Sequence, residues 1–180
     1  MGKVLEATHP SGEIIVFDDD SHTYTVKSTG ERFISVTTVL GEYFPKFDGP
    51  GVAEKCSNGS NPKYAGRPAA EILAEWDAEG ERGRTEGTNV HAYGEWRLLQ
   101  TFGPPRVECP ASISNRTAAL FNRIDQFFPT LLKHYKFVAA ELIIFSLKLK
   151  ISGMIDLLMQ CRKTGDFIVL DWKQNKEITM

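Results

Sequence analysis

The last third of the chain contains three apolar runs that are rich in β-branched residues and separated by short polar turns. This pattern is typical of three adjacent strands, which read "FVAAELIIFS", "LKISGMIDLLMQ" and "DFIVLDWK". Each run is interrupted by one acid: Glu141, Asp156 and Asp171. An ionised carboxylate that is buried without a partner costs several kcal/mol, so each acid predicts a compensating group. Three acids on successive strands indicate a common site, at which a cation, a metal or hydrogen bonds would compensate their charge.

In the last of these runs, one residue separates Asp171 from Lys173. In a strand with a period of two, both side chains point to one face, about 6 to 7 Å apart along the backbone. An ion pair near the end of a strand is one interpretation. Together with the acids of the neighbouring strands, the alternative interpretation is a lysine that works beside a metal ion.

Hard oxygen ligands that converge from adjacent strands suit Mg²⁺ or Mn²⁺. Asp156 and Asp171 are then predicted ligands, and the main-chain carbonyl of Trp172 is a third. Glu141 is a further ligand or a group that orients water. Lys173 would lower the pKa of an attacking water or stabilise charge on a phosphoryl oxygen. This is the chemistry of phosphodiester hydrolysis.

An upstream segment, "GTNVHAYGEW", places His91 and Glu95 four residues apart on one face of a helix. A solvated helix surface is the simpler interpretation of this pair. Taken with the strand acids, His91 becomes a candidate metal ligand through its neutral imidazole, and Glu95 a candidate for orienting a ligand.

Helical patterns precede the late strands and make the expected fold class α/β, a mixed central sheet flanked by helices. Pro68 suits the first turn of a helix. Gly80, Gly83 and Gly87 predict that this helix breaks and that a second one covers about 88–100. The segment "SNRTAALFNRIDQFFPTLLKHY" predicts a further helix with one apolar face.

Shorter elements are expected nearer the start of the chain. The runs "EIIVFDDD" and "HTYTVKS" predict two strands of an N-terminal β-meander within residues 1–34. The segment "ISVTTVLGEYF" predicts a short helix that Ser35 caps and Pro45 ends. Residues 48–67 are rich in Gly, Pro, Ser and Asn and predict a loop.

Composition limits the number of domains and the compartment. The 180 residues, 42% of them hydrophobic, suffice for one core, so we expect a single domain over 1–180 in which 35–180 follow the meander. The start has no targeting pattern and no run approaches a membrane span, so we expect a soluble, intracellular protein without a membrane partner. Neither a disulfide framework nor a metal cluster is expected from three widely spaced cysteines: Cys56, Cys109 and Cys161.

Contacts with nucleic acid would have to come from local patches, because the formal net charge is −2. Short basic clusters occur at Lys133, His134 and Lys136, at Lys148 and Lys150, and at Arg162 and Lys163. The aromatic side chains that could stack on unpaired bases, or else belong to the core, are Trp76, Tyr93, Trp96 and Trp172.

The order of Glu141, "SGMID" with Asp156, and "LDWK" with Asp171 and Lys173 resembles the PD-(D/E)XK nuclease superfamily. The segment "EGTNVHAYGEW" is similar to the G-x-x-x-H-x-x-x-E segment of its RecB-like exonuclease branch, which includes recombination nucleases. "SVTTVL" and the tryptophan-bearing helix before the histidine also resemble that branch. The resemblance covers residues 35–176.

The resemblance implies a restriction-endonuclease-like core and a Mg²⁺- or Mn²⁺-dependent deoxyribonuclease of DNA repair or recombination. It implies that His91, Asp156 and Asp171 bind the metal, that Glu141 assists and that Lys173 is catalytic. The expected activity is that of an exonuclease that prefers single-stranded DNA ends. The alternatives are a structure-specific endonuclease and a nucleic-acid-binding protein that keeps the fold with weak or no turnover.

Two features depart from the pattern of that family. Several RecB-like members hold an iron–sulfur cluster with four cysteines, which three cysteines cannot supply, so no such cluster is expected. Family members usually continue after the lysine strand into a helix bearing Gln and Tyr that grips the DNA, whereas this sequence ends at "NKEITM". We therefore expect either a truncation or a minimal variant that lacks this helix.

Overall fold

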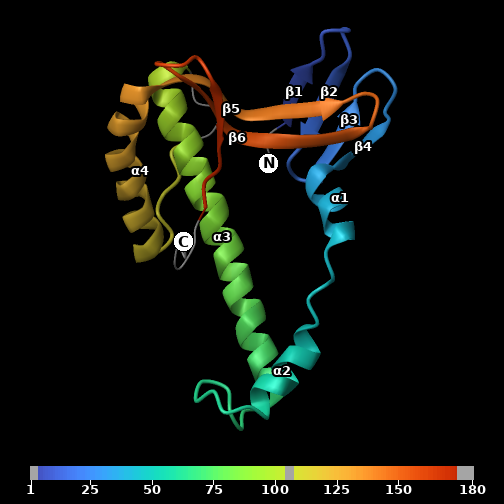
Figure 1. The fold of residues 1–180 in the computed structure, drawn as a ribbon, viewed down its shortest axis with the longest axis vertical. Coiled ribbons are helices and arrows are strands. Elements are labelled where there is room, and N and C mark those ends of the chain that lie inside the picture. The colour runs from blue at the N-terminus through green and yellow to red at the C-terminus, as the bar shows by residue number, and fades with distance from the viewer. Residues whose placement is uncertain (1–3, 104–107, 174–180) are drawn as a thin grey trace.

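The three late strands form one part of a mixed sheet in the computed structural model, which describes residues 4–103 and 108–173 (Figure 1). These strands are β5 (Tyr135–Ser146), β6 (Ile151–Cys161) and β7 (Phe167–Leu170). β6 pairs antiparallel with both β5 and β7. The prediction of an α/β fold with a mixed sheet and flanking helices is confirmed.

The N-terminal meander has four strands where the sequence predicted two: β1 (Val4–Thr8), β2 (Ile14–Asp18), β3 (Thr23–Val26) and β4 (Arg32–Ser35). Consecutive strands pair antiparallel. The two strands that the sequence did not predict are β1, which pairs with β2, and β4, which pairs with β3.

One edge of β6 is shared by two strands. β5 pairs along the other edge of β6. β4 pairs in parallel with the start of β6, at Ile151 and Ser152, and β7 pairs with its later part, from Leu157 to Gln160. The residues between, 153–156, therefore have no strand beside them on this edge within the described ranges. This gap contains Asp156.

Two short helices follow the meander. α1 (Val36–Tyr43) begins as predicted, because the Ser35 side chain accepts a hydrogen bond from the Thr38 N–H at 3.0 Å. The prediction of a loop over 48–67 is wrong in its first half, where α2 (Gly49–Ser57) forms. Its start has the composition of a loop, but Asp48 accepts from the Gly51 N–H at 3.0 Å and caps the helix.

α3 (Ala69–Phe102) is one continuous helix of 34 residues, so the predicted break is wrong. Gly80, Gly83 and Gly87 each cost about 1 kcal/mol relative to alanine in a helix. That cost is distributed over a long helix whose second half is buried around Leu98 and Leu99, and this packing outweighs it. Gly87 is therefore an interior residue and not the start of a second helix.

α4 (Asn115–His134) begins with a capping box, in which Ser114 accepts from the Thr117 N–H at 3.1 Å. One apolar cluster lies between α3, α4 and the late strands and includes Leu98, Phe128 and Leu157. A second cluster joins the meander to β5 through Ile15, Phe17 and Ile143. Within the described ranges, no helix combines the length and apolar character that a bilayer span requires.

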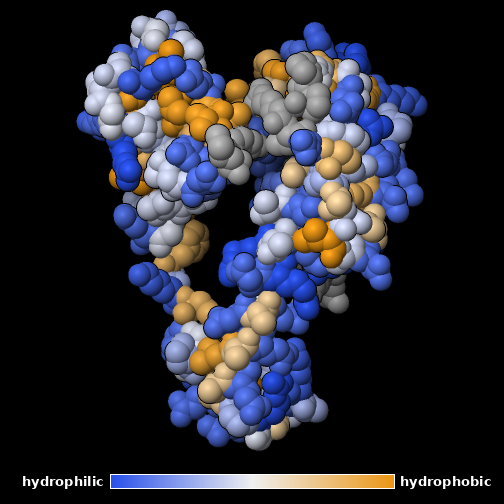
Figure 2. All heavy atoms as spheres, turned by 180° about the vertical axis from the view of Figure 1, so that it is seen from behind, coloured by the Kyte–Doolittle hydropathy of each residue, from blue (hydrophilic) through white to orange (hydrophobic). Residues whose placement is uncertain are grey.

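An opening passes through the molecule between the side that carries α1 and the side that carries α3 (Figure 2). Figure 1 shows the same arrangement from the front: α1 and the segment after it descend on one side, α3 descends on the other, and they meet at α2. β5 and β6 cross above. Protein chain therefore encloses the opening.

Gly94→Ala should destabilise the protein by about 1–3 kcal/mol, the usual cost of overpacking a core. A Cβ atom at Gly94 would lie 2.7 Å from Cε2 of Trp172, whose rigid ring also packs against Phe128. Gly83→Ala is the matched control on the same helix. Its Cβ would meet nothing within 4 Å, so it should stabilise by about 1 kcal/mol. Urea denaturation measures both, and equal stabilisation of the two variants would contradict this packing.

Candidate metal centre

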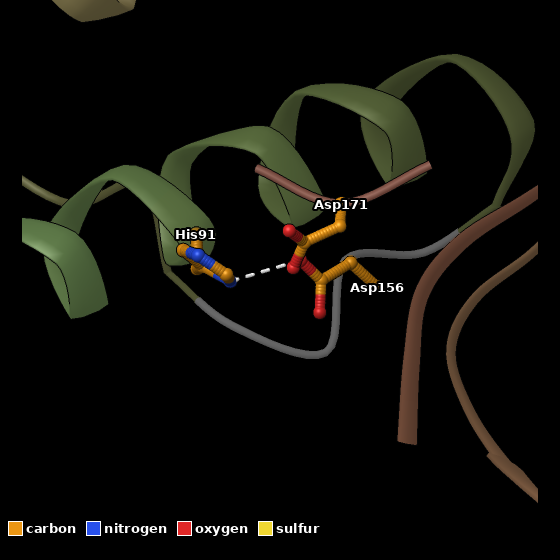
Figure 3. A group of neighbouring side chains, drawn as sticks. All are labelled: His91, Asp156 and Asp171. Atoms are coloured by element: carbon orange, nitrogen blue, oxygen red, sulfur yellow. Dashed lines mark ion pairs between the residues drawn. The ribbon is translucent and has the colours of Figure 1, made fainter. Parts of the chain in front are cut away.

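His91, Asp156 and Asp171 meet at the gap in the β6 edge (Figure 3). His91 comes from α3, Asp156 from β6, and Asp171 directly follows β7. One ligand atom from each lies within 4.8 Å of the others, and His91 Nδ1 lies 3.2 Å from Asp156 Oδ2. The predicted convergence of these three residues is therefore present.

Strand register explains why the two aspartates are neighbours. Leu157 pairs with Leu170, so Asp156 and Asp171 stand opposite each other one position further along the antiparallel ladder. Like charges directly opposite each other destabilise a strand pair. The Trp172 N–H offsets part of this repulsion by donating to Asp156 Oδ2 at 3.0 Å.

Lys173 forms the ion pair that was one interpretation of the Asp-x-Lys spacing. Its Nζ lies 2.8 Å from Asp171 Oδ2. The lysine side chain is 70% exposed, so the ammonium is also accessible to a ligand from solution. Its contact with Asp171 raises the pKa of Lys173, and the group stays a cation at neutral pH.

The two aspartates shift their pKa values in opposite directions. Burial raises the pKa of Asp156, and the neighbouring Asp171 adds to the rise, against the opposing effects of the Trp172 N–H and His91. Burial also acts to raise the pKa of Asp171, but hydrogen bonds with Lys173 and Asp156 outweigh it, and the net shift is downward. A divalent cation between the two carboxyl groups would favour the ionised form of both.

This donor set fits a divalent cation. Two carboxylates suit Mg²⁺ and Mn²⁺, and an imidazole nitrogen is compatible with Mn²⁺ and heavier ions. Asp156 and His91 are partly buried and Asp171 is exposed, so the cluster is open to solvent on one side. At Trp172, the main-chain N–H donates to Asp156. This contact does not involve the main-chain carbonyl, whose role as a metal ligand stays a prediction.

Glu141 and Glu95 share a cavity of about 1040 Å³ with His91 and Asp156. Glu141 stands opposite Asp156 in the register of β5 and β6, between the pairs Ala140–Leu157 and Leu142–Ile155. Its φ of 50° lies in the left-handed region, which costs a non-glycine residue about 1–3 kcal/mol. Glu141, Asp156 and Asp171 therefore form one row across three strands, but Glu141 is not among the three residues whose ligand atoms converge.

Glu95 is buried, with 2% of its surface exposed. It lies one turn after His91 on α3 and lines the same cavity. The interpretation of this pair as a solvated helix surface is therefore wrong for Glu95. Its predicted role in orienting a ligand stays a prediction.

Some of the other side chains predicted to contact nucleic acid have contacts within the protein. Tyr93 is buried and stacks on Phe121 with ring centroids 3.9 Å apart. Trp96 and Trp172 pack against the same apolar cluster. In the basic clusters, Lys150 pairs with Glu31, and Arg162 donates to the main-chain carbonyls of Leu132 and Tyr135.

Sequence reasoning missed a group of charged residues beside the centre, namely Arg82, Glu86 and Arg116. Arg82 and Arg116 line a second cavity that also includes His91 and Lys173. The signal that could have indicated this cavity is the spacing of Gly80, Gly83 and Gly87, which places three glycines on one face of a continuous helix.

The chain matches no protein-family model, no curated protein and no solved structure. Membership of the PD-(D/E)XK superfamily therefore stays a prediction from the motifs. The function has to be argued from the chemistry of the centre itself.

Mn²⁺ or Mg²⁺ should raise the melting temperature of the wild type, because an ion that binds only the folded state stabilises it, by about 2.7 kcal/mol at 100 times its Kd. Asp156→Asn should lose this response, since it removes one ligand charge. Asp166→Asn, an exposed aspartate outside the cluster, is the control and should keep the response. Differential scanning fluorimetry with a metal titration measures both. An unchanged response in Asp156→Asn would argue against the centre.

Proposed function

We propose that this chain is a Mg²⁺- or Mn²⁺-dependent deoxyribonuclease of the PD-(D/E)XK type that acts from the ends of single-stranded DNA. The observation that carries this proposal is the convergence of His91, Asp156 and Asp171 with Lys173 beside them. A divalent cation held there would supply Lewis acidity toward a phosphoryl oxygen and make water a stronger nucleophile near neutral pH.

Lys173 would stabilise the negative charge that develops on the phosphate during hydrolysis. Its ammonium is exposed and lies at the centre, so it can donate a hydrogen bond to a non-bridging oxygen. The raised pKa supports this electrostatic role, because a permanently protonated lysine cannot act as a base. Glu141, which lines the large cavity beside Asp156, is the candidate for orienting the attacking water.

The large cavity supports a strand as the substrate. Its walls come from α1 at Val36 and Thr37, from α3 at Thr88 and His91, and from β5 and β6. α1 and α3 are also the elements on either side of the opening in Figure 2. A single strand that enters this enclosed opening would need a free end.

Exposed aromatic side chains support a preference for unpaired bases. Tyr43, Phe44 and Phe47 are 80%, 68% and 73% exposed and lie on the end of α1 and the segment that follows it. Stacking of a base on an aromatic ring contributes about 1–3 kcal/mol and requires bases that are not paired. These residues replace the mostly buried aromatics that the sequence suggested.

Linear single-stranded DNA should be degraded with Mg²⁺ or Mn²⁺ and stay intact in EDTA. A single-stranded circle of the same sequence should survive, because it has no end to enter the opening. Gel electrophoresis of labelled substrates measures this, with blunt duplex DNA for comparison. Cleavage of the circle would identify the structure-specific endonuclease instead. Tight binding with no cleavage of any substrate would identify a binding protein.

Lys173→Ala should slow cleavage by about 10² to 10³ while DNA affinity falls much less, because one preorganised electrostatic donor is lost. Asp171→Asn should abolish cleavage and keep the fold, since it preserves shape and removes a ligand charge. Lys27→Ala, at an exposed lysine outside both cavities and outside the basic clusters, is the control. Single-turnover rates, filter binding and melting curves separate these effects. A Lys173→Ala variant that melts earlier but cuts normally would show that the lysine is only structural.

A further inference from the structure

A second cavity, of about 440 Å³, adjoins the candidate metal centre. Its walls come from α3 between Glu79 and His91, from the first turn of α4 at Arg116, and from the residues after β7 up to Lys173. Gly87 and His91 line both this cavity and the large one. The metal centre therefore lies where the two cavities meet.

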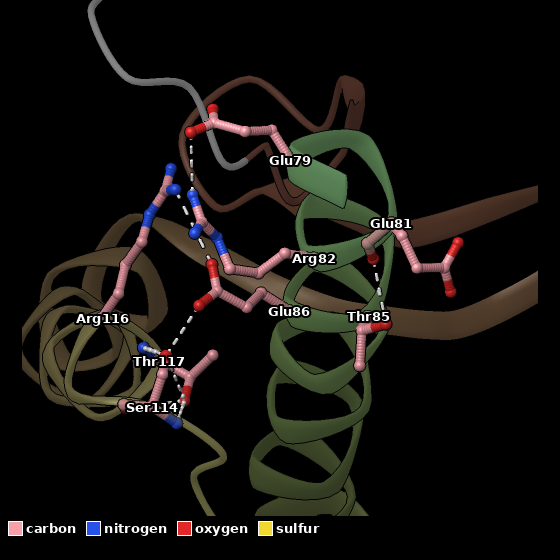
Figure 4. Close-up of polar contacts among 8 residues, drawn as sticks. All are labelled: Glu79, Glu81, Arg82, Thr85, Glu86, Ser114, Arg116 and Thr117. Carbon is pink, nitrogen blue, oxygen red and sulfur yellow. Dashed lines mark hydrogen bonds and ion pairs between the residues drawn. The ribbon is translucent and has the colours of Figure 1, made fainter. Parts of the chain in front are cut away.

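Three cations line the second cavity: Arg82, Arg116 and Lys173. Figure 4 shows the guanidinium groups of Arg82 on α3 and Arg116 on α4 converging. One acid, Glu79, also lines the cavity and lies 3.3 Å from Arg82 Nη2, in an exposed pair of the kind that contributes little. Arg116 and Lys173 also have acids beside them, Glu86 and Asp171, but these two acids do not line the cavity, so the charged side chains that line it are mostly cations.

A buried acid behind the cavity positions one of these arginines. Glu86 is 4% exposed, and its Oε2 lies 3.6 Å from Arg116 Nη1. The Ser114 hydroxyl donates to Glu86 Oε1 at 2.8 Å, which connects the acid to the start of α4 (Figure 4). Glu86 therefore holds Arg116 at the cavity wall without lining the cavity itself.

Part of the wall on α3 is bare helix backbone. Gly80, Gly83 and Gly87 follow one another at helical spacing and all line the cavity. A Cβ atom at Gly83 would meet nothing within 4 Å, so no described neighbour requires glycine there. Since glycine weakens a helix, its repeated use on this wall is consistent with room for a ligand against the backbone.

We infer that the second cavity binds the phosphate monoester at an end of the DNA strand. This inference rests on the proposed nuclease function. A terminal phosphate carries a charge of about −1.5 to −2 at pH 7, whereas an internal diester carries one charge, so three cations favour the terminal group. The two arginine forks suit its oxygens. The volume, at the lower end of the about 300–1,000 Å³ of small-ligand sites, suits one nucleotide better than a continuing strand.

Binding in EDTA tests the inference without cleavage. Fluorescence anisotropy would compare one single-stranded oligonucleotide with a 5′-phosphate, with a 3′-phosphate and with hydroxyl groups at both ends. We expect one phosphorylated form to bind about tenfold more tightly than the hydroxyl form. The phosphorylated oligonucleotide that binds more tightly identifies which end of the DNA strand the cavity holds. Equal affinity of the wild type for all three would overturn the inference.

Arg82→Gln and Arg116→Gln should each remove most of this tenfold advantage and leave the affinity for the hydroxyl form nearly unchanged. The matched controls are Arg84→Gln on α3 and Arg123→Gln on α4, which lie outside both cavities and should keep the advantage. A similar loss of affinity for all three oligonucleotides would indicate general attraction to DNA and overturn the site. If Arg116→Gln unfolds because Glu86 loses this ion pair, Arg82→Gln decides the question.

Gly83→Leu tests the second cavity with a substitution that should not destabilise the protein. Leucine favours a helix more than glycine does, so the melting temperature should hold or rise while the side chain fills the cavity and removes the phosphate advantage. Gly41→Leu in α1, also with open space around it, is the control. A retained advantage in Gly83→Leu would rule out this cavity. Absence of cleavage by the wild type with either metal would refute the proposed function. The binding measurements in EDTA test the phosphate site independently of cleavage.

Discussion

The division of one edge of β6 between two strands is the constraint on which the rest of the centre depends. β5 occupies one edge of this strand, and β4 and β7 occupy separate parts of the other. A strand has only two hydrogen-bonding edges, and among the described residues no strand occupies this edge between β4 and β7. Asp156 is in this interval, and His91 on α3 can therefore approach it to 3.2 Å.

The gap also concentrates negative charge, which the surrounding residues partly offset. Glu141, Asp156 and Asp171 form a row across three strands, an arrangement that costs free energy through repulsion. The Trp172 N–H donates to Asp156, and Lys173 pairs with Asp171. Gly94 contributes indirectly, because the absence of its side chain lets the Trp172 ring pack against α3.

The long helix α3 joins the parts of the molecule for which we propose a function. It presents His91 to the strand acids, carries the bare glycine wall of the second cavity, and extends along the opening to α2. A break at the glycines would have separated these parts. In the proposed function, the continuous helix would contact the DNA strand, the terminal phosphate of that strand and the metal centre.

The sequence by itself determined the late strands, their acids, the start of α1 at Ser35 and the candidate ligands His91, Asp156 and Asp171. The strands and the start of α1 follow from periodicity and capping, which act over a few neighbouring residues, and the candidate ligands follow from acids within the strands and from the resemblance of the motifs. Only the tertiary structure decided the parallel pairing of β4 with β6, the continuity of α3 and the approach of Arg82 to Arg116. Each of these depends on packing between segments far apart in the chain, which local propensity does not contain.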